Sequence, residues 1–165
     1  MGNRAVITFA PKSCVEKYRV KDGKNPNSVS GFVKDNANLV GVYVHWNGGI
    51  ESVKAFCQAA KEIGFRCPTS DRSYGIARFT QLVANFFGGT SSTSIGVDTL
   101  SNLDTDNYDN GVYIVGEDWE IIGREFSRGY GELDDERVDD GFVKYLIDTQ
   151  KGVDEVKKEL DKKGE

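Results

Sequence analysis

The hydrophobic and polar positions of this chain follow two patterns, one with the spacing of strands and one with the spacing of helices. Five short runs, several of them rich in Val, Ile and Tyr, are typical of strands and cover residues 3–9, 39–46, 94–98, 112–115 and 119–124. The last two runs flank Gly116-Glu117-Asp118, so we expect them to form a β-hairpin.

Longer runs repeat apolar residues every three or four positions, as the buried face of a helix does. The first run covers residues 50–63 and is followed by Gly64, a typical residue after a helix C-terminus. The second begins after Ser70 or Asp71, either of which is a good N-cap. These two runs therefore predict two neighbouring helices.

A third helical run starts near residue 137, and we expect its end, residues 150–165, to fray. Residues 11–39 show neither period and contain several Gly, Pro, Asn and Ser residues, so they are predicted to be a surface insertion. The order of the elements then favours a single α+β domain over residues 1–165, with three helices and a mostly antiparallel sheet of about five strands.

The composition suits one globular domain, because the chain has 165 residues, of which 38% are hydrophobic and 11% aromatic. There is no run of about 18 apolar residues and no apolar leader after Met1, so we expect a cytoplasmic protein without a membrane segment. Cys14, Cys57, Cys67 and the single His45 lack the spacing of a zinc site. Reduced thiols and no metal or cofactor are therefore predicted.

Charge is distributed unevenly along the chain, whose net charge is −5. Residues 1–97 carry 12 basic and 6 acidic residues, whereas residues 98–140, called here the acidic block, carry 3 basic and 14 acidic residues. The acidic block is either a solvated face or a surface complementary to a basic groove, such as a nucleic-acid channel in another protein. Either way, it argues against direct binding of duplex DNA, which requires positive potential along the contact face.

Within the acidic block, the candidate protein-binding residues lie in an Asp/Asn-rich loop and in the hairpin that follows it. They are Asp104, Asp106, Tyr108, Asp109, Glu117, Asp118 and Glu120. An acidic loop that carries a tyrosine suits contacts with proteins. A calcium loop starting at Asp106 would place Tyr108 at its third position, where an oxygen ligand of another type is required, so calcium is not expected.

A second candidate site is the turn between the second strand and the first long helix. It consists of His45, Trp46, Asn47, Gly48 and Gly49, and Tyr74 and Arg78 of the next helix are grouped with it as ligands for an anion or nucleotide. Backbone N–H groups at such a turn are suited to hold a phosphate or a carboxylate. The turn lacks the Lys and Ser/Thr of a P-loop. The alternative is a purely structural turn with Trp46 in the core.

Three arginines lie in or beside apolar runs, namely Arg4, Arg78 and Arg124. A buried arginine requires a partner that satisfies its charge. We therefore expect these arginines to pair with carboxylates of the acidic block.

Four stretches of this chain carry a resemblance to known proteins; they are Gly2–Ile7, Val42–Gly49, Asn85–Gly89 and Asp106–Gly111. They resemble small uncharacterised proteins of phages, plasmids and integrated elements of Gram-positive bacteria. The similarity spans residues 1–126 apart from 11–39, and no established activity or catalytic residue accompanies it. It implies a genomic context in which small accessory proteins often counter host defences.

Two hypotheses from different classes follow. In the first, the chain is a stoichiometric anti-defence inhibitor, similar to an anti-CRISPR protein, whose partner is a bacterial protein or a protein–nucleic acid complex. In the second, His45 acts as general acid or base on RNA or a nucleotide, or the same turn binds a signalling nucleotide without turnover. The first hypothesis, inhibition by contact, assigns no catalytic residue. No nucleophile elbow of the G-x-S-x-G type is present, so the sequence does not favour nucleophilic catalysis.

Overall fold

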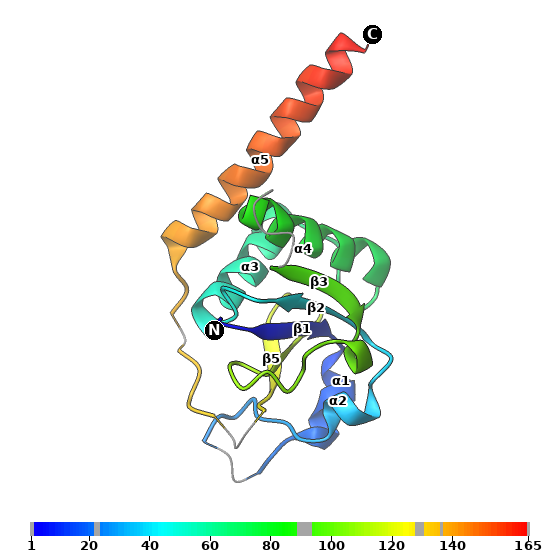
Figure 1. Cartoon of the computed structure of the whole chain (residues 1–165), viewed down its shortest axis with the longest axis vertical. Coiled ribbons are helices and arrows are strands. Elements are labelled where there is room, and N and C mark those ends of the chain that lie inside the picture. Colours follow the sequence, from blue (N-terminus) through cyan, green and yellow to red (C-terminus); the bar gives the residue numbers. More distant parts are fainter. Residues whose placement is uncertain (1, 22–23, 89–93, 128–130, 136, 165) are drawn as a thin grey trace.

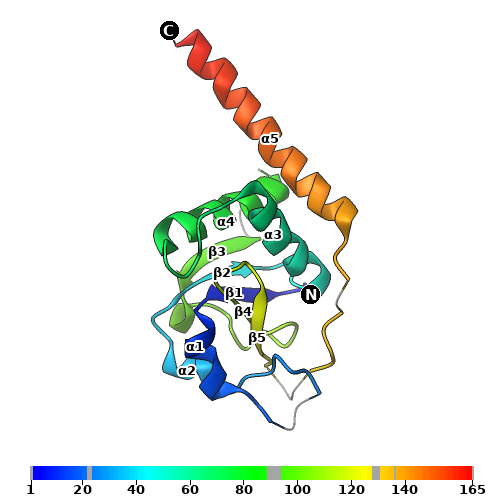
Figure 2. The same cartoon turned by 180° about the vertical axis from the view of Figure 1, so that it is seen from behind.

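The computed structural model describes residues 2–21, 24–88, 94–127, 131–135 and 137–164. These residues form one α+β domain around a five-stranded sheet with the spatial order β3-β2-β1-β4-β5 (Figures 1 and 2). The strands are β1 (Ala5–Phe9), β2 (Val40–Val44), β3 (Ile95–Thr99), β4 (Val112–Val115) and β5 (Ile121–Glu125). The predicted class, the five strands and the single domain are therefore confirmed.

The sheet is mixed rather than antiparallel throughout. The pairs β1–β2, β2–β3 and β4–β5 are antiparallel, as predicted for the hairpin, but β1 and β4 are parallel. Val6 pairs with Val112, so the central strand β1 lies beside a strand that comes much later in the sequence. Because β4 is added beside β1 after the chain has crossed from the β3 edge, no local turn signals this pairing.

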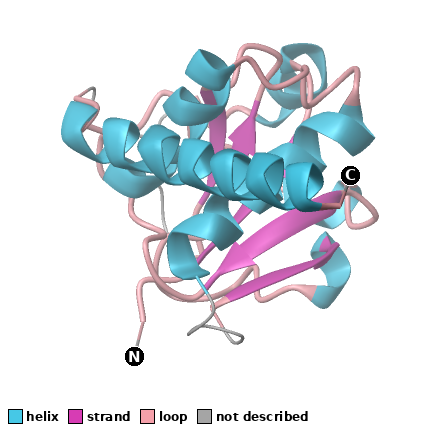
Figure 3. Cartoon of the chain, turned by 90° about the horizontal axis from the view of Figure 1, so that it is seen from above, coloured by secondary structure: helices cyan, strands magenta, loops and turns pink. Residues whose placement is uncertain are grey.

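One face of the sheet is covered by α3 (Ile50–Ile63), α4 (Arg72–Phe87) and the first half of α5 (Asp140–Lys163), as Figure 3 shows from above. The helix α3 has the predicted bounds, and Gly64 ends it with a φ of 89°, which favours glycine. The largest part of the core lies between these helices and the sheet. Its aromatic centre is Phe79, whose ring lies 5.3 Å from that of Phe9 and 5.7 Å from that of Trp119.

The opposite face is covered by the segment that was predicted to be a surface insertion. Residues 11–39 contain α1 (Lys12–Val15), a 3₁₀ turn (Glu16–Tyr18) and α2 (Phe32–Asp35), so the described residues form five α-helices and not the predicted three. Val15 and Phe32 are fully buried and pack in one cluster with Ile114 of β4. Burying each such side chain contributes about 1.5–3 kcal/mol. The segment is therefore part of the core, and its status as an insertion relative to other proteins stays a prediction.

The last helix begins at Asp140, where the side chain of Asp139 accepts a hydrogen bond from the N–H of Phe142. Its first half buries Val143 and Leu146 against α3 and α4. The helix continues through Gly152, and its second half extends away from the domain (Figures 1 and 2). Fraying of residues 150–165 stays a prediction.

No helix in the described part of the chain combines the length and the apolar content needed to cross a bilayer. Among the same residues, no three His, Cys, Asp or Glu side chains lie close enough together to hold a metal ion. The three cysteines are free thiols, and burial raises the pKa of Cys57 to about 12.

Candidate functional site

The seven candidate protein-binding residues divide into two groups at opposite ends of β4. The first group precedes the strand and the second group follows it in the β4–β5 turn, so the acidic block does not form one patch. The first group is Asp104, Asp106, Tyr108 and Asp109, and the second is Glu117, Asp118 and Glu120.

Other carboxylates of the acidic block have structural partners. Asp134 pairs with Arg124, whose side chain is only 4% exposed and whose guanidinium lies 3.8 Å from the ring centroid of Tyr113. Asp135 pairs with the exposed Arg137, which lowers the pKa of Asp135 to about 2 through a hydrogen bond. The predicted pairing of Arg124 with the acidic block is thus confirmed.

The loop of residues 104–110, called here the Asp loop, is held in shape by the buried side chain of Asn107. Its Nδ2 donates to the carbonyls of Asp104 (3.0 Å) and Gly111 (3.2 Å), and its Oδ1 accepts from the N–H groups of Asp109 (3.1 Å) and Gly111 (3.0 Å). The next residue, Tyr108, has a φ of 61° and is 60% exposed. A bulky residue in this left-handed conformation is strained, and such strain often accompanies function.

Arg4, the residue directly before β1, links the Asp loop to the sheet. Its Nε donates to Oδ2 of Asp109 at 2.8 Å, and its Nη1 lies 3.5 Å from Oδ2 of Asp104. The predicted partner of Arg4 in the acidic block is therefore confirmed. The hydrogen bonds from Arg4 lower the pKa of Asp109.

Asp109→Asn is expected to weaken the dependence of stability on pH below about pH 4. The folded protein holds the pKa of Asp109 below its ordinary value of 3.8. The contribution is therefore fully present above the unfolded pKa and is lost as the pH falls through the folded pKa. Urea unfolding of both proteins between about pH 2.5 and 6 measures this difference. Identical pH profiles would contradict the assignment.

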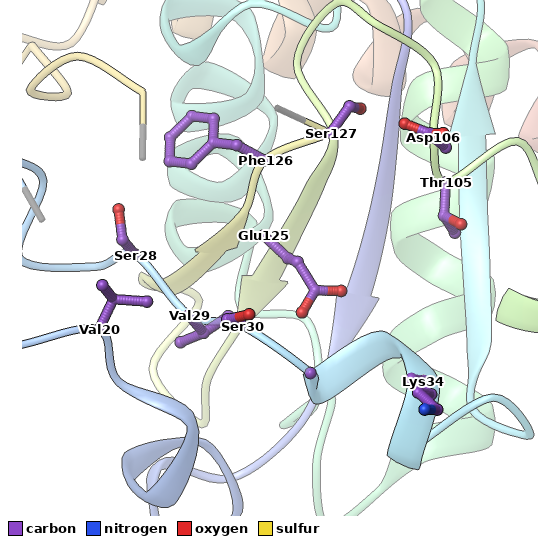
Figure 4. A pocket seen from close by; sticks show the side chains of 11 residues that line it. Val20, Ser28, Val29, Ser30, Lys34, Thr105, Asp106, Glu125, Phe126 and Ser127 are labelled. Atoms are coloured by element: carbon purple, nitrogen blue, oxygen red, sulfur yellow. The ribbon is translucent and has the colours of Figure 1, made fainter. Parts of the chain in front are cut away.

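A pocket of about 570 Å³ lies beside the Asp loop (Figure 4). Thr105 and Asp106 line it on the side of the loop, and the carboxylate of Glu125, at the end of β5, points into it. The carboxylate of Glu125 accepts hydrogen bonds from the N–H groups of Phe32 (2.9 Å) and Val33 (3.2 Å) at the start of α2. Burial raises the pKa of Glu125.

The remaining lining of this pocket combines hydroxyl groups, one cation and apolar side chains. Hydroxyl groups surround the two carboxylates, and Lys34 of α2 is the cation that lines the pocket. The apolar surface comes from Val20, Val29 and Phe126. The hydroxyl-bearing residues other than Thr105 are Ser28, Ser30 and Ser127.

Backbone groups of the predicted anion-binding turn form hydrogen bonds with the residues directly before β1. The N–H of Gly48 donates to the carbonyl of Asn3 at 2.8 Å, and a Cβ at this position would lie 2.5 Å from that oxygen. The hydroxyl of Tyr113 donates to the carbonyl of Gly48 at 2.7 Å. Gly48 is therefore required for close packing, which supports the structural interpretation of the turn.

Of the side chains of the same turn, Trp46 is exposed, whereas His45 and Asn47 are half-buried. Trp46 is 48% exposed, so its alternative placement in the core is wrong. Nδ1 of His45 lies 2.8 Å from the hydroxyl of Tyr43, and Asn47 has a φ of 59°. Gly49 precedes α3 without a side-chain cap. Neither the 570 Å³ pocket nor a second cavity of about 670 Å³ in the described residues is lined by His45, whose catalytic role stays a prediction.

Tyr74 and Arg78 lie far from His45 along the sheet. Nη1 of Arg72, in the first turn of α4, donates to the carbonyl of Phe9 at the end of β1. His45, in contrast, accepts from Asn3 before the start of β1. The structure therefore separates the two parts of the predicted nucleotide site. Within the described residues, Arg78 bonds Gln81 and no carboxylate, so its predicted acidic partner is wrong.

Residues missed by the sequence analysis include Glu125 and Lys34. Asn107 has a local signal in the sequence, because Asn and Asp side chains commonly bond the backbone two residues ahead. Glu125 and Lys34 had none, since the pocket joins segments that are distant in sequence. Comparisons of the chain with protein-family models, curated proteins and solved structures find no match.

Proposed function

We propose that this chain is an accessory protein that inhibits a bacterial defence effector by contact, using the Asp loop and the adjoining pocket. The observation that supports the proposal most is the Asp loop itself, whose exposed carboxylates and tyrosine are held in place by the buried Asn107. A binding loop that is already ordered loses little conformational entropy when a partner binds.

The proposed partner is a cytoplasmic bacterial protein with a basic nucleic-acid groove. A lysine or arginine from that groove would enter the pocket between Asp106 and Glu125. A carboxylate oxygen can accept more than one hydrogen bond, so the contacts of Glu125 with α2 leave acceptor capacity for a cation. Tyr108 and Trp46, both exposed, would supply the aromatic contacts that commonly dominate binding energy.

The proposed binding surface uses only the acidic residues of the Asp loop, at one end of β4. Glu117, in the other group, accepts a hydrogen bond from the N–H of Lys12 at 3.0 Å, and Glu120 lines the second cavity. Net negative charge at the Asp loop is reduced by Arg4, which leaves Asp106 as the carboxylate of the loop with the clearest access to a cation.

Charge reversal at the two ends of β4 tests the proposal, because the structure supplies a matched control. The variant Asp104→Lys/Asp106→Lys/Asp109→Lys should weaken inhibition of a sensitive RNA-guided bacterial nuclease by about 100-fold or more. The variant Glu117→Lys/Asp118→Lys/Glu120→Lys carries the same change in charge and should stay within about threefold of the original protein. Target cleavage is measured with both variants after thermal unfolding has shown that they are folded.

The dependence of inhibition on salt concentration provides a second test. Inhibition by the unmodified protein should weaken as the salt concentration rises from about 50 to 300 mM, because rim charges act through screened attraction. Equal losses in the two triple variants would contradict the assignment of the site to the Asp loop. A lack of inhibition across a panel of such nucleases would contradict the anti-defence function.

A further inference from the structure

A hollow of about 260 Å³ lies on the domain where α3 ends and α4 begins, apart from the Asp loop. Gly64, Phe65 and Arg66 follow α3, and Tyr74 and Arg78 lie on the first turns of α4. The two segments are adjacent at the ends of these helices (Figures 1 and 2). The hollow therefore combines two guanidinium groups with a tyrosine ring that is 59% exposed.

The two arginines of the hollow differ from most of the other arginines of the described residues. Neither has a carboxylate within ion-pair distance, and the hydrogen bond of Arg78 goes to Oε1 of Gln81 at 3.0 Å. The others bond either a carboxylate or, for one of them, a backbone carbonyl; they are Arg4, Arg19, Arg72, Arg124 and Arg137. Two arginines without a carboxylate partner thus line one hollow of a protein whose net charge is −5.

The geometry of Arg66 suits the recognition of an anion. Its guanidinium carbon lies 4.5 Å from the ring centroid of Tyr74. Stacking on a ring orients the guanidinium and leaves its in-plane N–H groups available for oxygen atoms. Because guanidinium N–H groups match the spacing of phosphate oxygens, a pair of arginines favours phosphate over a monovalent spherical anion.

The helix ends do not cancel this positive potential. The C-terminus of α3 contributes a partial charge of roughly −0.5, whereas the two arginines contribute two full positive charges. The N-terminal end of α4, which carries Tyr74, adds a partial positive charge of similar size.

We propose that this hollow binds the phosphate group of a nucleotide, with Tyr74 in contact with the base. Arg66 and Arg78 hold the phosphate oxygens. The exposed part of the Tyr74 ring supplies an aromatic surface, which is sequence-tolerant and stabilises a base by stacking. The site is independent of the Asp loop and of His45.

NMR titration of the whole protein with three probes tests the site. Adenosine monophosphate and inorganic phosphate should shift the backbone amides of residues 64–66 and 74–78, whereas adenosine alone should not. Arg66→Ala/Arg78→Ala should weaken the binding of both phosphate-containing probes at least about tenfold. Lys61→Ala, which removes an exposed cation of α3 outside the hollow, should change it by less than about twofold.

Tyr74→Ala separates the contributions of base and phosphate. It should weaken the binding of adenosine monophosphate by about fivefold or more, because both the base contact and the orientation of Arg66 are lost. The binding of inorganic phosphate, which loses only the orientation of Arg66, should fall by a smaller factor. Equal binding by the double-arginine variant, binding of adenosine as tight as that of the monophosphate, or no shift at these amides with about 10 mM adenosine monophosphate would each overturn the proposal. Nuclease inhibition by the double-arginine variant should be unaltered, so the site and the proposed inhibition are tested separately.

Discussion

Asp134→Ala is expected to lower the free energy of unfolding by about 3–5 kcal/mol, because it leaves the charge of Arg124 buried without its carboxylate. Arg124 is 4% exposed and lies between the rings of Tyr113 (3.8 Å) and Phe126 (4.6 Å), so the guanidinium cannot turn toward water without disturbing the core. Its remaining hydrogen bond goes to the carbonyl of Asn110 at 3.2 Å. Urea unfolding and the accompanying fall in Tm measure the effect.

The neighbouring ion pair provides the control. Asp135→Ala removes the partner of Arg137, whose side chain is 88% exposed, and should leave the free energy of unfolding nearly unchanged. In contrast, Arg124→Met/Asp134→Leu should recover most of the stability lost in Asp134→Ala, because it removes the buried charge as well as its partner. Equal stability of the Asp134→Ala and Asp135→Ala proteins would contradict the role given to the buried pair.

Asn107→Ala is expected to lower the free energy of unfolding by about 2–4 kcal/mol and to abolish the proposed inhibition. The substitution removes four hydrogen bonds, including the one that satisfies the N–H of the buried Gly111, whereas the carbonyl of Gly111 keeps its bond from the N–H of Val6 at 3.0 Å. Asp109 would lose the hydrogen bond from its N–H to Asn107. The strained backbone at Tyr108, whose φ is positive, would then no longer be held on both sides. Urea unfolding measures the first effect, and the nuclease assay measures the second.

The matched control for this variant is Asn102→Ala. Asn102 donates to Oδ1 of Asp98 at 3.2 Å on the exposed side of the sheet edge, so its loss should cost less than about 0.5 kcal/mol. Retention of full inhibition by Asn107→Ala, in a protein shown to be less stable, would contradict the preorganised Asp loop as the binding surface.

Elements with strong local signals were predictable. The bounds of α3 agree with the apolar spacing of residues 50–63, and Gly64 stops the helix in the left-handed conformation that glycine adopts easily. The β4–β5 hairpin likewise follows from the turn at residues 116–118. In these elements the residues that determine the structure lie within a few positions of one another.

The two short helices α1 and α2 were not predictable from the sequence. A helix of four residues, such as α1 or α2, is too short to be stable alone, because nucleation costs more than its few hydrogen bonds return. Both helices form here against the sheet, through Val15 and Phe32. The stability of α1 and α2 comes from packing against residues elsewhere in the chain. Four residues are also too few to show a repeated apolar spacing, so residues 11–39 give no helical pattern.

The sequence by itself determined the class of the domain, the long helices, the hairpin, and the pairing of Arg4 and Arg124 with acidic residues. Those features depend on local periodicity or on the rule that a buried charge requires a partner. Only the tertiary structure decided the parallel pairing of β1 with β4, the division of the acidic residues between the two ends of β4, and the separation of His45 from Arg78. Each of these depends on contacts between residues far apart in sequence, and no local pattern records which distant segments will meet.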